Sequence, residues 1–307
     1  MRRFRWALVT LGLVLVGLPA GAADAATLTA DSDKFFSYIT YHADPGEQND
    51  VSISSASGRV TIVDRGVAAI VPSQESIRDC VVVLNRVSCR DSSWTVVGLD
   101  LNDRNDSVAA TRNVGVLGGP GDDVVTGSAF ASFTGGPGAD RLSTTTGHFV
   151  YDTDEVGDVH VTTDGVADDG HAGERDNVGP GLGVSVFGPG RHTLIGDDAA
   201  NDLSISGFSP ATIDGGGGND SLSGSADADL MTGGAGDDRI HGGQGADDID
   251  GGAGRDFLSG DSGDDTVRAR DGEVDELLEC ADGLDLLIAD PADPPNFGGR
   301  CEQVDLG

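Results

Sequence analysis

Residues 215–268 read GGGGNDSLS, GSADADLMT, GGAGDDRIH, GGQGADDID, GGAGRDFLS and GDSGDDTVR, six consecutive blocks of nine residues. The sixth residue of every block is an aspartate: Asp220, Asp229, Asp238, Asp247, Asp256 and Asp265. The eighth residue is aliphatic or methionine: Leu222, Met231, Ile240, Ile249, Leu258 and Val267. A short fixed period with one acid and one apolar residue per unit is typical of a stacked β-solenoid.

Each block must turn sharply and then form about three residues of strand. Paired glycines adopt positive φ angles without a Cβ clash, and they expose backbone carbonyls, which are hard oxygen ligands. Together with the sixth-position carboxylates, such oxygens favour calcium over softer metals. In the strand the eighth residue points inward and its neighbours point outward. The blocks therefore predict calcium-binding turns around an apolar core.

These blocks resemble the repeats-in-toxin (RTX) family of hemolysin-type calcium-binding repeats. The resemblance implies an all-β fold, a right-handed parallel β-solenoid (β-roll) in which two consecutive blocks make one turn. It also implies that Ca²⁺ lies between one block and the block after next. The ligands would be the carbonyls of positions two and four with the aspartate of the earlier block. The carbonyls of positions one and three and the aspartate of the later block would complete the shell.

The resemblance assigns three sites when it is carried onto this sequence. The first takes Gly234, Gly236 and Asp238 with Gly251, Ala253 and Asp256. The second takes Gly243, Gly245 and Asp247 with Gly260, Ser262 and Asp265. The third takes Gly216, Gly218 and Asp220 with Gly233, Ala235 and Asp238. The block at Gly224 has Ser225 and Asp227 where glycines are expected, which leaves its site with the block at Gly242 unassigned.

Two isolated blocks precede the regular array. They are GGPGDDVVT from Gly118 and GGPGADRLS from Gly135, and they add Asp123 and Asp140 to the expected metal ligands. Residues 101–108 read as a decayed block with Asp106 in the acidic place. The steps from Asp106 to Asp123 and on to Asp140 are both 17 residues, close to one two-block turn. We therefore expect the coil to begin here. Further along, His192 and Asn201 occupy the acidic place, which predicts metal-free turns.

The chain opens with a basic segment, an apolar run from Ala7 to Leu18 and small residues up to Ala26, typical of a secretory signal peptide. We expect five segments: a signal peptide (1–26), a strand-rich degenerate solenoid (27–117), an irregular solenoid with an acidic loop (118–214), the regular roll (215–268) and a C-terminal cap (269–307). The apolar run is too short for a membrane anchor and no second one follows. A secreted, extracellular protein without membrane insertion is expected.

Four cysteines remain in the exported part: Cys80, Cys89, Cys280 and Cys301. An even count in such a chain indicates disulfides. Three pairings are possible, and nearness in sequence favours Cys80–Cys89 and Cys280–Cys301. A zinc site is disfavoured, because paired C-x-x-C motifs and adjacent histidines are missing.

The formal net charge is −33, and removal of residues 1–26 makes it −35. This excess argues against nucleic acid and anionic membranes as partners, and predicts a chain that compacts only when cations neutralise it. No motif typical of a catalytic site stands out. We therefore expect a monomeric, non-enzymatic protein with calcium ions as partners. A secreted hydrolase that uses the repeats as a folding module, with its catalytic part in residues 27–117 or 144–214, and a calcium-dependent surface adhesin are the alternatives.

Overall fold

A computed structural model describes residues 25–32, 37–67, 69–72, 80–90, 95–152, 157–293 and 301–307. These residues form β-strands, turns and irregular segments but no helix, so the fold is all-β as expected. Within the described ranges there is accordingly no helix able to span a membrane. The expected signal peptide lies outside the described residues, except for Ala25 and Ala26, which begin the first strand.

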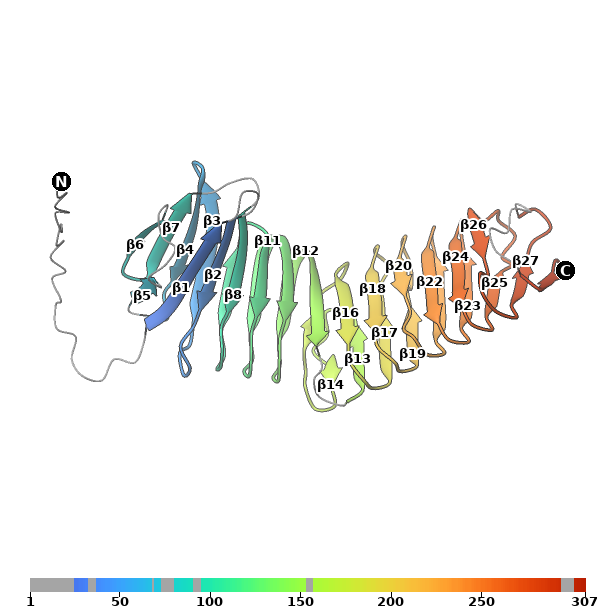
Figure 1. The fold of residues 1–307 in the computed structure, drawn as a ribbon, viewed down its shortest axis with the longest axis horizontal. Coiled ribbons are helices and arrows are strands. Elements are labelled where there is room, and N and C mark those ends of the chain that lie inside the picture. Colours follow the sequence, from blue (N-terminus) through green and yellow to red (C-terminus); the bar gives the residue numbers. More distant parts are fainter. Residues whose placement is uncertain are drawn as a thin grey trace, which may run out of the picture.

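The chain winds into a parallel β-solenoid of about 11 turns (Figure 1). One sheet runs through β8 (Thr95–Asp100), β9 (Ser107–Ala110), β10 (Val114–Leu117), β11 (Val124–Thr134), β12 (Arg141–Asp152), β15 (Asn177–Val178), β16 (Gly183–Phe187), β18 (Asp202–Ser206), β20 (Ser221–Ser223), β22 (Arg239–Gln244), β24 (Phe257–Ser262) and β26 (Leu277–Glu279). The other holds β13 (Val159–Thr162), β14 (Gly170–His171), β17 (His192–Ile195), β19 (Ala211–Asp214), β21 (Leu230–Ala235), β23 (Asp248–Ala253), β25 (Thr266–Ala269), β27 (Leu286–Ala289) and β28 (Gln303–Asp305).

Consecutive blocks of the regular array alternate between the two sheets. Ile240 of β22 pairs with Leu222 and Leu258 on either side, and Ile249 of β23 pairs with Met231 and Val267. Each residue thus lies next to its counterpart two blocks away, which confirms that two blocks make one turn. All six eighth-position side chains are fully buried. They form two facing apolar rows that fill the narrow interior of the coil, and their burial is the main drive for stacking.

The N-terminal end contains antiparallel hairpins as well as solenoid strands. Its strands are β1 (Ala25–Ser32), β2 (Ser37–His42), β3 (Asp50–Ala56), β4 (Arg59–Asp64), β5 (Ala69–Pro72), β6 (Cys80–Val83) and β7 (Arg86–Arg90). The pairs β1–β2, β3–β4, β4–β7 and β6–β7 are antiparallel. Ser57 and Gly58 both have positive φ, as a two-residue hairpin turn requires. Parallel pairing of β2 with β8 and of β3 with β9 joins these hairpins to the solenoid.

Both expected disulfides are confirmed. Cys80–Cys89 links the paired residues of the β6–β7 hairpin. Cys280–Cys301 lies at the other end, where β26, β27 and β28 continue both sheets beyond the last regular block. Figure 1 shows the two ends far apart along the axis of the coil, so the disulfides secure opposite ends.

Candidate calcium-binding site

Sixth-position aspartates from successive turns form a hydrogen-bonded ladder. The backbone N–H of each donates to Oδ1 of the aspartate one turn later: Asp220 to Asp238 (2.8 Å), Asp238 to Asp256 (2.9 Å), Asp229 to Asp247 (2.8 Å) and Asp247 to Asp265 (2.8 Å). The first two bonds run along one edge of the roll and the other two along the opposite edge. Each carboxylate is therefore fixed by one of its two oxygens.

The second oxygen of most of these carboxylates is buried, and no hydrogen-bond partner for it lies within the described part of the chain. This holds for Oδ2 of Asp106, Asp123, Asp140, Asp220, Asp238, Asp247, Asp265, Asp275 and Asp285. The residues themselves are at most 3% exposed. A buried, unpaired carboxylate oxygen is costly unless a cation or a proton neutralises it. The repetition of one such oxygen in turn after turn is the arrangement that a row of metal ions would satisfy.

The first glycine of each block leaves room beside that oxygen. A Cβ atom added to Gly242 would lie 2.5 Å from Asp247 Oδ2 and 2.7 Å from the carbonyl oxygen of Gly260. One added to Gly215 would lie 2.5 Å from Asp220 Oδ2 and 2.6 Å from the carbonyl oxygen of Gly233. In both cases the carboxylate oxygen of one block and the first carbonyl of the block after next converge on one point. These are two of the ligand types that the sequence assigned to a shared ion.

The remaining assigned carbonyls lie at the same interface between turns. The N–H of Gly218 donates to the carbonyl of Ala235 (2.8 Å), and the N–H of Ala235 donates to the carbonyl of Gly216 (3.0 Å). The same fourth-to-third-position bond joins Gly236 to Ala253 (2.8 Å) and Gly245 to Ser262 (2.9 Å). A carbonyl oxygen has two lone pairs, so each of these acceptors retains one for a cation. Gly216, Gly234 and Gly243 have φ between 88° and 106°, which L side chains rarely adopt.

Burial raises the pKa of the ladder carboxyls. Desolvation raises the pKa of Asp238 to about 6 and that of Asp247 to about 7, partly offset by the backbone N–H that each accepts. Neighbouring carboxylates raise both further. The protein alone thus stabilises the charged form poorly, although calcium needs that form as its ligand.

Among the described residues, no three His, Cys, Asp or Glu side chains gather as a metal cluster. The donors available here are instead two carboxylates and several carbonyls at each interface between turns. Hard oxygen donors of this kind suit Ca²⁺ and fit poorly with zinc or copper.

The block at Gly224 departs from the others in structure as in sequence. The N–H of Ser225 donates to Oδ2 of Asp229 (2.6 Å), and its hydroxyl donates to Oδ1 (3.1 Å). Both oxygens of this carboxylate are therefore satisfied within the protein. The block that the sequence left without a site thus has no unpaired carboxylate oxygen among the described residues.

The turns before the regular roll also satisfy their own polar groups. Asn201 stands in the ladder: its N–H donates to Asp220 Oδ1 (2.7 Å), and its Oδ1 accepts from the N–H of Asp197 (2.9 Å). Its Nδ2 donates to the carbonyl of Leu182 (3.3 Å). His192 is buried, and its Nδ1 accepts from the N–H of Val159 (3.3 Å). Neutral side chains thus continue the stack with no carboxylate to neutralise.

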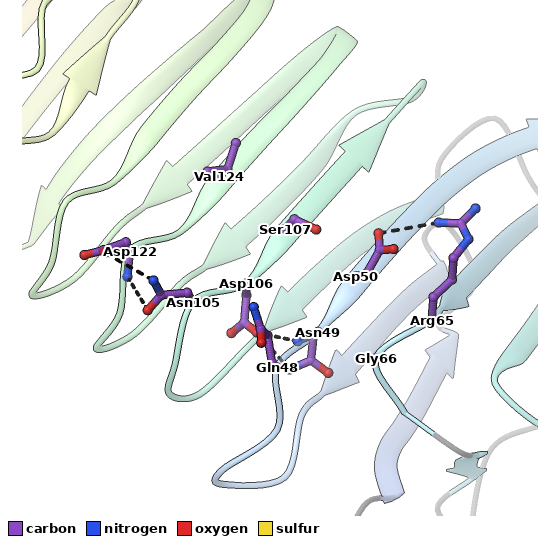
Figure 2. A pocket seen from close by; sticks show the side chains of 10 residues that line it. All are labelled: Gln48, Asn49, Asp50, Arg65, Gly66, Asn105, Asp106, Ser107, Asp122 and Val124. Carbon is purple, nitrogen blue, oxygen red and sulfur yellow. Dashed lines mark hydrogen bonds and ion pairs between the residues drawn. The ribbon is translucent and has the colours of Figure 1, made fainter.

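Asp106, Asp123 and Asp140 form a separate ladder near the N-terminal end. Asp106 N–H donates to Asp123 Oδ1, and Asp123 N–H to Asp140 Oδ1, both at 2.8 Å. Figure 2 shows the start of this ladder, where Asn49 lies beside Asp106 in an open hollow of about 500 Å³. Asp50 and Asp122 also line the hollow, and Arg65 is the one cationic side chain among the described residues that line it. Because the N–H of Asp106 donates to Asp123 as in the regular blocks, the decayed block keeps the backbone geometry of the ladder.

Several ladder residues were missed by the sequence analysis. Asp176 accepts the N–H of Asp140 (2.8 Å), and the expected acidic loop thus returns a buried carboxylate to the stack. The sequence signal for it is the two-residue spacing of Asp176 and Val178, which matches the sixth and eighth positions of a block.

Side chains at position five form a second ladder on the outside of the turns. Oδ1 of Asn219 accepts from the N–H of Asp237 (3.1 Å), and Oδ1 of Asp237 accepts from the N–H of Arg255 (3.0 Å).

Comparison with protein families agrees with this geometry. Residues 212–240 and 241–273 match the sequence profile of the RTX calcium-binding nonapeptide repeat (4 copies). Comparison with curated proteins gave no match. The matched residues contain all three sites assigned from the sequence, whereas Asp123 and Asp140 lie outside them. Over residues 212–273 the chain thus consists of RTX calcium-binding nonapeptide repeats, wound into a β-roll.

Proposed function

We propose that this chain is an exported, monomeric, non-enzymatic protein that folds into its β-roll on binding extracellular calcium. The carrying observation is the row of buried Oδ2 atoms, of which Asp238 and Asp247 are examples, facing carbonyls of the adjacent turn. Mutual repulsion of these carboxylates opposes compaction until cations neutralise them. Calcium-binding free energy then becomes folding free energy.

We assign the ions to the three interfaces that the resemblance to RTX repeats implies, with Asp123 and Asp140 as ligands of a separate ion. Two disulfides fit an oxidising, extracellular location. The five segments expected from the sequence remain our division of the chain, with the N-terminal hairpins and the C-terminal turns as the two ends of one stack.

A surface contact in the middle of the chain bears on the hydrolase alternative. Ser185 Oγ lies 3.3 Å from His148 Nδ1, and His148 Nε2 lies 3.1 Å from Asp202 Oδ2. The strand β16, which carries Ser185, is paired on both sides by β12 and β18, so its amides are engaged in the sheet and not free to stabilise an oxyanion. The Asp202 side chain is 60% exposed. We therefore interpret these residues as a polar contact on the sheet surface, and labelling of Ser185 by a fluorophosphonate probe would contradict this.

Calcium titration of the metal-stripped protein tests the proposal. Circular dichroism should change from coil to β as calcium is added, with a cooperative midpoint, and magnesium at the same ionic strength serves as the control. Metal-stripped protein that is already fully β, and whose unfolding midpoint calcium does not change, would refute calcium-driven folding.

A further inference from the structure

A further nine-residue block follows the regular roll, after the segment that carries Asp275 and β26. Residues 280–288 read CADGLDLLI, with Gly283 in position four, Asp285 in position six and Leu287 in position eight. Leu287 is fully buried and pairs with Val267 of the last regular block. This block lies beyond residue 273, where the match to the repeat profile ends.

The backbone of this block reproduces the regular interface between turns. Asp282 N–H donates to the carbonyl of Asp261 (3.1 Å), and Gly263 N–H donates to the carbonyl of Asp282 (2.8 Å). These bonds correspond one for one to those between the blocks at Gly215 and Gly233. Asp261 and Ala281, the second residues of the two blocks, have φ of 66° and 63°. They adopt the left-handed conformation that glycine provides elsewhere, at a cost that the surrounding structure must offset.

Asp265 and Asp285 also have the arrangement of the aspartates in the regular blocks. Asp265 N–H donates to Asp285 Oδ1 at 2.9 Å. Oδ2 of Asp265 and Oδ2 of Asp285 are both buried, with no hydrogen-bond partner in the described ranges, and the two residues are 1% and 0% exposed. Gly260 has no Cβ, and one added there would clash with Asp265 Oδ2. The space that the regular blocks keep beside this oxygen is therefore kept here as well.

We propose that a further Ca²⁺ binds between the block at Gly260 and the block at Cys280. Its ligands are the carbonyls of Asp261 and Gly263, the carboxylate of Asp265, the carbonyls of Cys280 and Asp282, and the carboxylate of Asp285. The inference rests on the proposed function and extends it beyond the repeats that the family profile matches. Asp265 then serves two ions, one on each side of its turn.

The structure also explains why the array ends at this site. The first position of the new block is Cys280, which carries a Cβ where each regular block has a glycine. The next acid in this ladder is Glu302, whose Oε2 accepts the N–H of Asp285 at 3.1 Å. Cys280 is bonded to Cys301, the neighbour of Glu302. The disulfide thus holds both the last ligand-bearing turn and the residue that closes the ladder.

Asp285→Asn tests the site, with Glu276→Gln as its charge-matched control. The amide introduced by Asp285→Asn retains an oxygen that accepts the N–H of Asp265, so the ladder is preserved while the ligand charge is lost. The Glu276 side chain is exposed and is not a proposed ligand, so its replacement removes one negative charge from this end of the roll without touching the site. Equilibrium dialysis with radioactive calcium should show one ion fewer per chain for Asp285→Asn and an unchanged number for Glu276→Gln.

Hydrogen–deuterium exchange of the wild-type protein gives a second measurement that needs no variant to fold. Calcium should slow exchange of the amides in residues 280–289. An equal number of ions in wild type and Asp285→Asn would overturn this site while leaving the proposed function intact, as would exchange in residues 280–289 that calcium leaves unchanged. A wild-type protein that binds no calcium would instead remove the proposed function itself.

Discussion

The backbone N–H of Asp238 donates a 2.9 Å hydrogen bond to Oδ1 of Asp256, the aspartate one turn later. The two oxygens of a ladder carboxylate therefore have different roles. Oδ1 joins neighbouring turns of the folded roll, while Oδ2 is available to a ligand. Substitutions that separate the two roles give the most direct tests of the roll.

Replacement of Asp238 by asparagine and by alanine should have different effects. Asp238→Asn retains an acceptor for the N–H of Asp220 but loses ligand charge, so calcium should bind more weakly and fewer ions should be held. Asp238→Ala also leaves that buried N–H unpaired, which should lower the free energy of unfolding by a further 1–3 kcal/mol or so, roughly the cost of one unsatisfied group. Urea unfolding in saturating calcium measures the difference. The exposed Asp250→Asn is the charge-matched control, and equal stability of the two Asp238 variants would contradict the ladder.

The calcium-free protein should become less stable as the pH rises from about 5 to about 8. Burial raises the pKa of Asp238 to about 6, of Asp247 to about 7 and of Asp140 to about 8, from the model-compound value of 3.8. The folded state therefore binds more protons than the unfolded state in this range. The contribution of these groups to stability is fully present below about pH 4 and is lost as the pH passes through the folded-state values. Circular dichroism of metal-stripped protein across this pH range measures the folded fraction, and a β content that rises with pH would disprove the prediction.

Gly242→Ala should weaken calcium binding more than Gly115→Ala. The new Cβ at position 242 would lie 2.5 Å from Asp247 Oδ2 and 2.7 Å from the carbonyl oxygen of Gly260, so both oxygens must move. At Gly115 a new Cβ meets nothing within 4 Å, and the backbone there is not left-handed. Isothermal titration calorimetry compares the two. Equal calcium affinities would show that the space beside Oδ2 is not part of a metal site.

Removal of the C-terminal disulfide should loosen the last turns. Cys280 and Cys301 are 21 residues apart, and closing a loop of this length stabilises by about 3 kcal/mol through restriction of the unfolded chain. The Cys280→Ser/Cys301→Ser double variant should therefore unfold at lower urea and need more calcium to reach its folding midpoint. Cys80→Ser/Cys89→Ser, at the opposite end, should leave the calcium midpoint of the roll unchanged. If the C-terminal double variant had the same calcium midpoint as wild type, the disulfide would not contribute to calcium-driven folding of the roll.

Much of the solenoid could be predicted because its information is local and periodic. Asp238 and Ile240 are two residues apart, and the same spacing recurs in every regular block, so one nine-residue pattern identifies both the turn acid and the buried strand residue. The N-terminal hairpins were not predicted. Their strands alternate like solenoid strands, and the pairing of β3 with β4 depends on a short turn at Ser57 and Gly58 that has no periodic signal.

By itself, the sequence determined the repeat and the buried eighth-position row, which follow from spacing along the chain and from the separation of apolar and acidic residues. The two-block turn was implied by the resemblance to RTX repeats, and nearness in sequence favoured the disulfide pairing that the structure confirms. Only the tertiary structure decided which oxygen of Asp265 is bonded and which is not, and that Cys280 to Ile288 stacks on the last regular block as a further block. Ala281 shows the reason: its backbone is left-handed, like that of Asp261 at the same position of the stacked block, and no residue-by-residue preference of alanine predicts it.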